Sequence, residues 1–377
     1  MKQLALFLAF SLCTAAFAQK GLSRKAAEEA SAFLIAQWKT EKVAKLMGNE
    51  RDKAIRQDTL QMKYHYTIFG EEPIDGRSLW ISLHGGGNVP GKINDSQWEN
   101  QKRLYKPAEG VYLSPRAPWN DWDMWCKPPI DSMFEELIQT MIVTQNVNPD
   151  KVYLMGYSAG GDGVWRLAPR LADHWASASM MAGHPGDVGL VNVRNLPYTI
   201  WVGELDAAYN RNVLVRQRGV QLDSLQKGDP EGYVHECHVM EGMPHWMKLK
   251  DAAAVPWMAQ YRRNPYPTKV AWQQEAVLKH SFYWLQVPVD EMARGKRIIA
   301  QIADNVITIS ECDYSRLTIL LNDEMVNLDK SVKVVMNGKT LFKGKVRRTM
   351  ENLRKTLSER NDPSYVFPSA IDVAIKK

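Results

Sequence analysis

Cysteine is scarce in this chain, and its few cysteines do not suit a structural role. Four occur among 377 residues, no CxxC pair is present, and Cys13 falls in an N-terminal apolar stretch. The remaining Cys126, Cys237 and Cys312 are odd in number and widely spaced, which excludes a disulfide framework and allows at most one bridge within the chain. Neither they nor the histidines have the spacing of metal ligands, so we predict no metal site.

A strong charge of one sign is also lacking. The formal net charge is +6, and the densest basic cluster, residues 343–348, is short and isolated. Basic clusters of this size are usually solvated surface, so we predict no nucleic-acid partner. No apolar run reaches the roughly 20 residues that a membrane-spanning helix needs.

The N-terminus is typical of an export signal. Lys2 precedes an apolar stretch, and residues 16–18 read Ala-Phe-Ala, a small-x-small cleavage pattern ahead of Gln19. We therefore expect residues 1–18 to be removed as a signal peptide and the mature protein to be secreted or periplasmic. After that removal we expect no stable membrane insertion. A membrane anchor is the alternative, and the short apolar stretch argues against it.

Three regions follow, distinguished by the period of their apolar residues. Residues 19–59 have apolar positions at helical spacing and are predicted to be an N-terminal helical segment. Residues 60–262 alternate short apolar runs with helical patterns, which is typical of an α/β domain with a mostly parallel sheet and helices on both faces. Residues 263–377 are rich in strand-like runs, so we predict a small C-terminal β-sandwich-like domain with one short helix.

The expected strands can be given by residue number. In the α/β region they are 62–68, 79–83, 111–113, 152–155, 178–182, 198–202 and 233–240. In the C-terminal region they are 281–287, 297–310, 317–321 and 332–336, the last followed by the hairpin signal Asn337-Gly338. An amphipathic helix is expected around residues 134–142, with a capping box from Ser132 and Glu135 at its start.

The most informative motif is Gly156-Tyr157-Ser158-Ala159-Gly160, which directly follows the apolar run 152–155 and precedes a helical pattern. A strand that reverses sharply into a helix presents its central serine as a nucleophile, and the flanking glycines make room for the turn. The Ala159 N–H is then placed to bind a developing oxyanion. A pentapeptide of this kind is common by chance, so its context has to support it.

A serine hydroxyl needs a base to take its proton, and the base needs an acid to hold its tautomer. Asp206 follows the strand 198–202 and His245 follows the strand 233–240, so we predict Ser158, Asp206 and His245 as the catalytic residues. Asp206 as a helix cap is the alternative. The fallback acid is Glu204, and the fallback bases are His235 and His238, which are disfavoured because they lie inside a strand.

The sequence His84-Gly85-Gly86-Gly87 comes immediately after the strand 79–83. Glycines there let backbone N–H groups approach a tetrahedral intermediate, so we predict that Gly85 or Gly86, together with Ala159, forms an oxyanion hole. A merely flexible loop is the alternative.

These four segments together resemble the α/β-hydrolase superfamily over about residues 60–262. Within it the chain is similar to the secreted polyhydroxybutyrate depolymerase, feruloyl esterase and acetylxylan esterase group. The resemblance implies a serine esterase that cleaves carboxylic esters, either carbohydrate-linked acyl esters or short polyester and acyl esters, through an acyl-enzyme without a cofactor. The C-terminal region has no counterpart that we can identify in that group.

Substrate contacts are predicted from residues near the same strand ends. The candidates are His84, Trp119, Trp122, Trp125, His184 and Trp246. The three tryptophans of the 119–125 loop either form a stacking platform for a sugar or phenolic ring or pack beneath the loop.

Two other functions remain open. A serine peptidase of the prolyl-oligopeptidase type shares the fold and the three catalytic residue types, although no anchor for a free amine is identifiable. The other is a non-catalytic glycan-binding protein on a hydrolase scaffold, against which the complete set of three residues argues.

Overall fold

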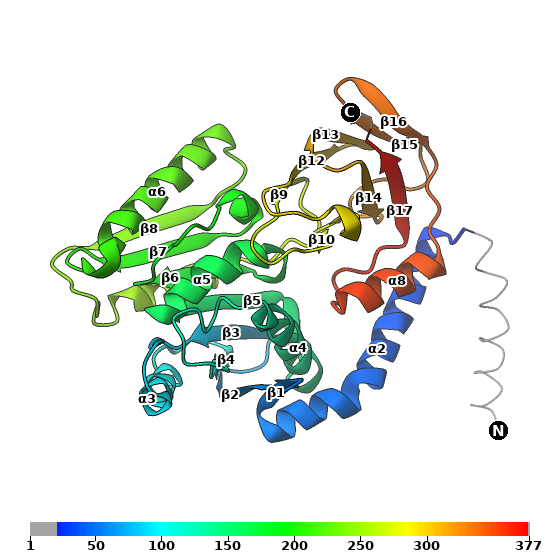
Figure 1. Ribbon diagram of the computed structural model, residues 1–377. Coiled ribbons are helices and arrows are strands. Elements are labelled where there is room, and N and C mark those ends of the chain that lie inside the picture. The colour runs from blue at the N-terminus through cyan, green and yellow to red at the C-terminus, as the bar shows by residue number, and fades with distance from the viewer. Residues whose placement is uncertain (1–20, 376–377) are drawn as a thin grey trace, which may run out of the picture. The chain divides into compact units, whose positions relative to one another are not determined.

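The computed structural model describes residues 21–375, which form two compact units (Figure 1). One unit is Val43–Asn264, and the other combines the chain before residue 43 with the chain from Pro265 onward. The predicted signal peptide, residues 1–18, lies outside the described residues. No helix within residues 21–375 has the length and apolar character needed to cross a membrane.

The larger unit contains an eight-stranded sheet in the order β1-β2-β4-β3-β5-β6-β7-β8. Strands β4, β3, β5, β6, β7 and β8 run parallel, whereas β2 is antiparallel to both β1 and β4. The strands are β1 (Ala54–Gln57), β2 (Leu60–Phe69), β3 (Arg77–Leu83), β4 (Gly110–Pro115), β5 (Val147–Tyr157), β6 (Ser177–Met181), β7 (Tyr198–Gly203) and β8 (His235–Met240). This arrangement confirms the predicted α/β class.

Helices cover both faces of this sheet. The helices are α3 (Gly91–Gln101), α4 (Pro129–Thr144), α5 (Ala159–Arg170), α6 (Arg211–Gly228) and α7 (Ala254–Met258). Residues paired across neighbouring strands point to the same face of the sheet. Tyr157 pairs with Met181, and Met181 pairs with Trp201, so these three side chains lie on one face, where they form a buried cluster with residues of α7. The opposite face includes Leu83 and Cys237, which approach α5 and α6. The core is therefore two-sided, as the nearly continuous apolar strands predict.

Two local expectations need correction. The N-terminal helix α2 (Arg24–Asp52) ends at Asp52 instead of continuing toward residue 59, because residues 54–57 pair with β2 as strand β1. Helix α4 begins at Pro129, one turn earlier than the predicted capping box. Ser132 consequently lies inside the helix, where its hydroxyl bonds the Gln57 side chain instead of capping.

The smaller unit contains two sheets and helix α8 (Met350–Arg360). One sheet has the order β10-β11-β14-β17 and the other β16-β15-β13-β12-β9. The strands are β9 (Lys269–Gln273), β10 (Ser281–Phe282), β11 (Leu285–Gln286), β12 (Arg297–Ala303), β13 (Val306–Cys312), β14 (Arg316–Leu321), β15 (Val332–Met336), β16 (Lys339–Gly344) and β17 (Ser369–Ala374). Alternate residues of β12, β13 and β17 are buried, so each sheet buries one face.

The predictions for this unit need several corrections. The expected strand 281–287 is a short hairpin of β10 and β11, the expected strand 297–310 is a hairpin of β12 and β13, and β9 and β17 were not predicted. The N-terminal part of α2 also groups with this unit, where the Trp38 indole donates to Asn361 Oδ1 at 3.2 Å and the Leu22 N–H donates to the Arg348 carbonyl at 2.8 Å. The N-terminal helix therefore belongs in large part to the C-terminal fold.

Candidate active site

Ser158 occupies a strained turn between β5 and α5. Its φ and ψ are 57° and −123°, a positive-φ conformation that a non-glycine residue rarely adopts outside functional sites. A Cβ on Gly156 would lie 2.4 Å from the Gly160 carbonyl oxygen, and one on Gly160 would lie 2.2 Å from the Leu83 carbonyl oxygen. The two glycines are therefore required by backbone contacts, and the turn projects the serine toward a cavity.

The structure brings Ser158, His245 and Asp206 into one hydrogen-bonded chain. His245 Nε2 lies 2.9 Å from Ser158 Oγ, and His245 Nδ1 lies 2.7 Å from Asp206 Oδ2. Asp206 is only 2% exposed, and its other carboxylate oxygen lies 3.5 Å from Arg211 Nη1. Water is thus largely kept from the acid, while His245 stays partly exposed beside the serine.

The fallback residues have other contacts. Glu204 accepts the Gly242 N–H at 3.0 Å and so holds the turn that precedes His245. His235 bonds Asp223, and His238 bonds Glu236 while its ring stacks on Trp201 at 3.8 Å. These three residues bond neither Ser158 nor His245.

Tyr157, which no sequence pattern singles out, fixes the loop that carries His245. Its hydroxyl donates to the His245 carbonyl at 2.6 Å and accepts the Met247 N–H at 3.0 Å. Burial raises the pKa of Tyr157, so the phenol stays protonated and keeps this donor. A tyrosine between the glycine and serine of the motif gives no sign of this role in the sequence alone.

The glycine loop after β3 offers free backbone donors beside the serine. Gly85 approaches Ser158 closely, since a Cβ on it would lie 3.2 Å from Ser158 Cβ. Within residues 21–375 no protein acceptor takes the N–H of Gly85, Gly86 or Ala159. The Gly87 N–H, in contrast, donates to Asn94 Oδ1 at 2.9 Å.

Asn94 is a second residue that the sequence did not reveal. Its side-chain amide donates to the Val89 carbonyl at 3.2 Å and to Asn120 Oδ1 at 2.9 Å, while its oxygen accepts the Gly87 N–H. The buried amide therefore ties α3 to the glycine loop and fixes the loop's course past the serine.

His84 was predicted to contact substrate, and this prediction is wrong. The side chain is fully buried, with Nε2 accepting the Ala117 N–H at 3.2 Å and Nδ1 2.6 Å from the Gly85 carbonyl oxygen. Burial lowers the pKa of His84 to about 4, so the ring is neutral, and these partners place its proton on Nδ1. His84 supports the glycine loop from beneath.

The three tryptophans of the 119–125 loop separate into different roles. Trp125 is buried, donates to the His84 carbonyl at 3.0 Å and packs on Phe134, so its predicted substrate contact is wrong. Trp119 lies under Lys127 Nζ, 4.8 Å from its ring centre. Trp122 is 49% exposed and meets Tyr209 edge to face at 5.7 Å. Only Trp122 retains the exposure that stacking on a ligand requires.

The predicted pocket residues His184 and Trp246 also differ. His184 donates its backbone N–H to Asp162 at 2.6 Å and accepts the Gly186 N–H at Nδ1, so it is engaged in the protein and does not line the cavity. Trp246 is 44% exposed, lies against Tyr157 at 5.5 Å between ring centres and does line the cavity.

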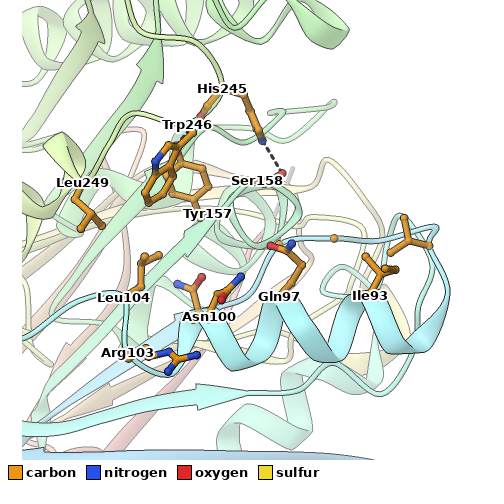
Figure 2. Close-up of a pocket in the computed structure, with 14 residues that line it drawn as sticks. Ile93, Gln97, Asn100, Arg103, Leu104, Tyr157, Ser158, His245, Trp246 and Leu249 are labelled. Carbon is orange, nitrogen blue, oxygen red and sulfur yellow. Dashed lines mark hydrogen bonds between the residues drawn. The ribbon is translucent and has the colours of Figure 1, made fainter.

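A cavity of about 740 Å³ opens beside Ser158 and His245 (Figure 2). Tyr157, Leu104, Trp246 and Leu249 form an apolar wall, and α3 forms the facing wall. The residues lining the α3 side are Ile93, Gln97, Asn100, Gln101 and, just beyond the helix, Arg103. Within residues 21–375 no group of three or more His, Cys, Asp or Glu residues is arranged to hold a metal ion. A mainly apolar cavity with a few polar groups beside a nucleophile is typical of a small-molecule site.

Comparisons with known proteins give only distant likenesses. No protein-family model matches the sequence, and no curated protein matches it. Among solved structures, a thermostable esterase is 18% identical with a TM-score of 0.45, covering 56% of this chain and 64% of its own, so this chain spans less than two thirds of it. A ferulic acid esterase is 14% identical, with a TM-score of 0.38 and coverage of 55% and 95%. A carboxylesterase from Mesorhizobium loti is 15% identical, with a TM-score of 0.39 and coverage of 55% and 99%.

By the strand order of its sheet and the turn at Ser158, the larger unit has the α/β-hydrolase fold.

Proposed function

We propose that this protein is a serine hydrolase that cleaves carboxylic esters through an acyl-enzyme on Ser158. The proposal rests on one observation: Ser158 Oγ, His245 and Asp206 form a chain of contacts, at 2.9 Å and 2.7 Å, at the mouth of a cavity. In this arrangement the serine can lose its proton to His245 Nε2 as it attacks a carbonyl carbon. Asp206 accepts from Nδ1–H, which sets the tautomer and stabilises the imidazolium.

The free N–H groups of Gly85, Gly86 and Ala159 supply the second requirement. When the carbonyl oxygen becomes an oxyanion, preorganised donors stabilise it, and one such donor is typically worth about 3 kcal/mol in the transition state. Asn94 and His84 hold the glycine loop without using those donors. His245 then returns its proton to the leaving alcohol, and water attacks the acyl-enzyme by the same route in reverse.

Ester substrates fit the site better than peptides. The cavity walls carry apolar and amide side chains and one arginine, and among residues 21–375 no acidic residue lines the cavity to receive the free amine of a peptide. The structurally similar proteins named above are esterases, which agrees with the choice of ester substrates, but the choice does not rest on them. Short acyl esters and carbohydrate-linked acyl esters are both within the proposed substrate range.

The proposal can be tested with a fluorophosphonate probe and a panel of acetyl, butyryl, hydroxybutyryl and feruloyl esters. The native protein should be labelled at Ser158 and turn over at least one ester. Ser158→Ala should remove labelling and reduce turnover by about 10⁴-fold or more, because the nucleophile is gone while the fold is kept.

Matched histidine variants provide the control. His245→Ala should abolish turnover, whereas His238→Ala, which removes a histidine that bonds Glu236 instead of the serine, should leave it nearly unchanged. Dipeptide amides in place of the esters test the peptidase alternative. A folded native protein that neither takes the probe nor cleaves any ester would contradict the proposal.

A further inference from the structure

Arg103 differs from the other arginines of the larger unit. Each of the others between Val43 and Asn264 makes an ion pair or a hydrogen bond, whereas the Arg103 guanidinium makes neither within residues 21–375. The partnered ones are Arg51, Arg56, Arg77, Arg116, Arg166, Arg170, Arg194, Arg211, Arg216, Arg218, Arg262 and Arg263. Arg103 is exposed, and it lines the cavity that holds Ser158. Its charge is therefore available to a ligand.

The surroundings of Arg103 leave that charge uncompensated. No aspartate or glutamate of residues 21–375 lines the cavity, and the neighbouring polar groups on the α3 side, Gln97 and Asn100, are neutral amides with exposed side chains. Neither amide has a hydrogen-bonding partner in the described part of the chain. A guanidinium fork presents paired N–H donors that match a carboxylate or another oxyanion.

One wall of the cavity between the serine and Arg103 is apolar. Tyr157 and Trp246 stand close to Ser158, and Leu104 lies between them and Arg103 (Figure 2). A ligand spanning this distance would place methylene or ring carbons against the apolar wall and an oxyanion at its far end. The amides of Gln97 and Asn100 face the same path and can bond hydroxyl or carbonyl groups on it.

We infer that Arg103 is an anion anchor that selects esters carrying a carboxylate, or a similar oxyanion, separated from the scissile carbonyl by an apolar spacer. This inference rests on the proposed ester hydrolysis at Ser158 and adds the substrate class. The anchor binds only the anion and takes no part in the chemical step, so its loss affects selectivity without disabling the nucleophile.

The kinetic test uses 4-nitrophenyl monoesters of dicarboxylic acids with four to ten carbons, compared with 4-nitrophenyl esters of monocarboxylic acids of equal length. The ratio of kcat/KM, charged over neutral, should reach a maximum at one length. Arg103→Gln should lower that maximum about five- to tenfold while neutral esters change little, because only the ion pair is lost. The preference should also shrink in high salt.

Lys106→Gln is the matched control, because it removes one positive charge from a nearby exposed position that does not line the cavity. The ratio of kcat/KM for charged over neutral esters should be the same in Lys106→Gln as in the native protein. A parallel series of butyrate esters of ω-hydroxy acids and of alcohols covers the opposite orientation of the substrate. A preference in either series that disappears in Arg103→Gln supports the anchor. A preference in neither series, or one that Arg103→Gln leaves unchanged, overturns it.

A binding measurement keeps this inference separate from the proposed function. Titration calorimetry of the free dicarboxylic acids against Ser158→Ala, and against the same variant with Arg103→Gln, needs no turnover. Affinity about five- to tenfold weaker in the double variant supports the anchor even if no ester is cleaved, in which case only the proposed function fails. Equal affinity in both variants counts against the anchor even if esters are cleaved normally.

Discussion

Two parts of the chain border the same cavity, and they differ in how firmly the protein fixes their residues. Around Ser158 the backbone is tightly constrained, and at Gly156 and Gly160 it leaves no room for a Cβ. On the α3 side, Gln97, Asn100 and Arg103 are exposed side chains with no hydrogen-bonding partner in residues 21–375. The protein's own packing therefore dictates the serine turn, whereas the α3 side chains are held by no other protein group and are open to solvent and to a ligand. In the proposed function, chemistry and selectivity would be carried by parts of the fold with very different tolerance to change.

The largest expected effect comes from the tightly packed side. Gly160→Ala would place a methyl 2.2 Å from the Leu83 carbonyl oxygen, so β3 and α5 must separate or the turn must rearrange. We expect a loss of stability of about 3 kcal/mol or more and loss of fluorophosphonate labelling. Chemical denaturation and probe labelling measure the two effects.

Gly48→Ala provides the comparison for that variant. Gly48 lies inside α2 with nothing within 4 Å of an added Cβ, so alanine should stabilise the helix by about 0.5–1 kcal/mol. If Gly160→Ala is as well tolerated as Gly48→Ala, the backbone around Ser158 is not as tightly packed as we infer.

An intermediate effect is expected for Tyr157→Phe. The variant removes a donor to the His245 carbonyl and an acceptor for the Met247 N–H, leaving two polar groups of the His245 loop without their partner. Because the histidine loses its support, we expect kcat to fall about tenfold while KM changes less, with melting temperature lowered as well. Ser158 should still react with the probe, but more slowly.

Tyr105→Phe separates positioning from stability. Tyr105 is a buried tyrosine of the same core, and its hydroxyl bonds Asp251 instead of the His245 loop. The Tyr105→Phe variant should be less stable than the native protein but should keep its kcat. A parallel loss of kcat in both variants would mean that Tyr157 acts only through general stability.

The same contrast explains what the sequence could predict. Some features leave strong local patterns in the sequence, because backbone packing and the spacing of apolar residues constrain the residue types. They are the buried parallel sheet, the glycine-flanked serine and the strand ends that carry Asp206 and His245. The four-residue strand β1 was missed, since so short a run after a long helix has too few residues to show alternation. Burial of Trp125 but not Trp122 depends on contacts with His84 and Phe134 that no local pattern encodes.

Roles that depend on contacts between distant segments were equally hidden. Tyr157 reaches the backbone of His245 and Met247, 88 and 90 positions further along the chain, and Asn94 reaches Asn120, 26 positions away. The significance of Arg103 comes from the absence of a partner, which only the folded structure can show. A polar helix face with unpaired residues looks the same in sequence as ordinary solvated surface.

The smallest effect should come from the exposed α3 wall. Gln97 has no hydrogen-bonding partner in the described chain, so Gln97→Ala should change stability by less than about 0.5 kcal/mol and leave cleavage of 4-nitrophenyl acetate unchanged. With a longer ester whose hydroxyl or carbonyl groups pass the amide, KM should rise two- to fivefold, the effect of losing about one hydrogen bond. Ser96→Ala, at the neighbouring exposed position of α3 that does not line the cavity, should alter neither constant. Equal KM values for both variants across short and long esters would show that the α3 wall does not contact the substrate, and the cavity would then select through its apolar wall alone.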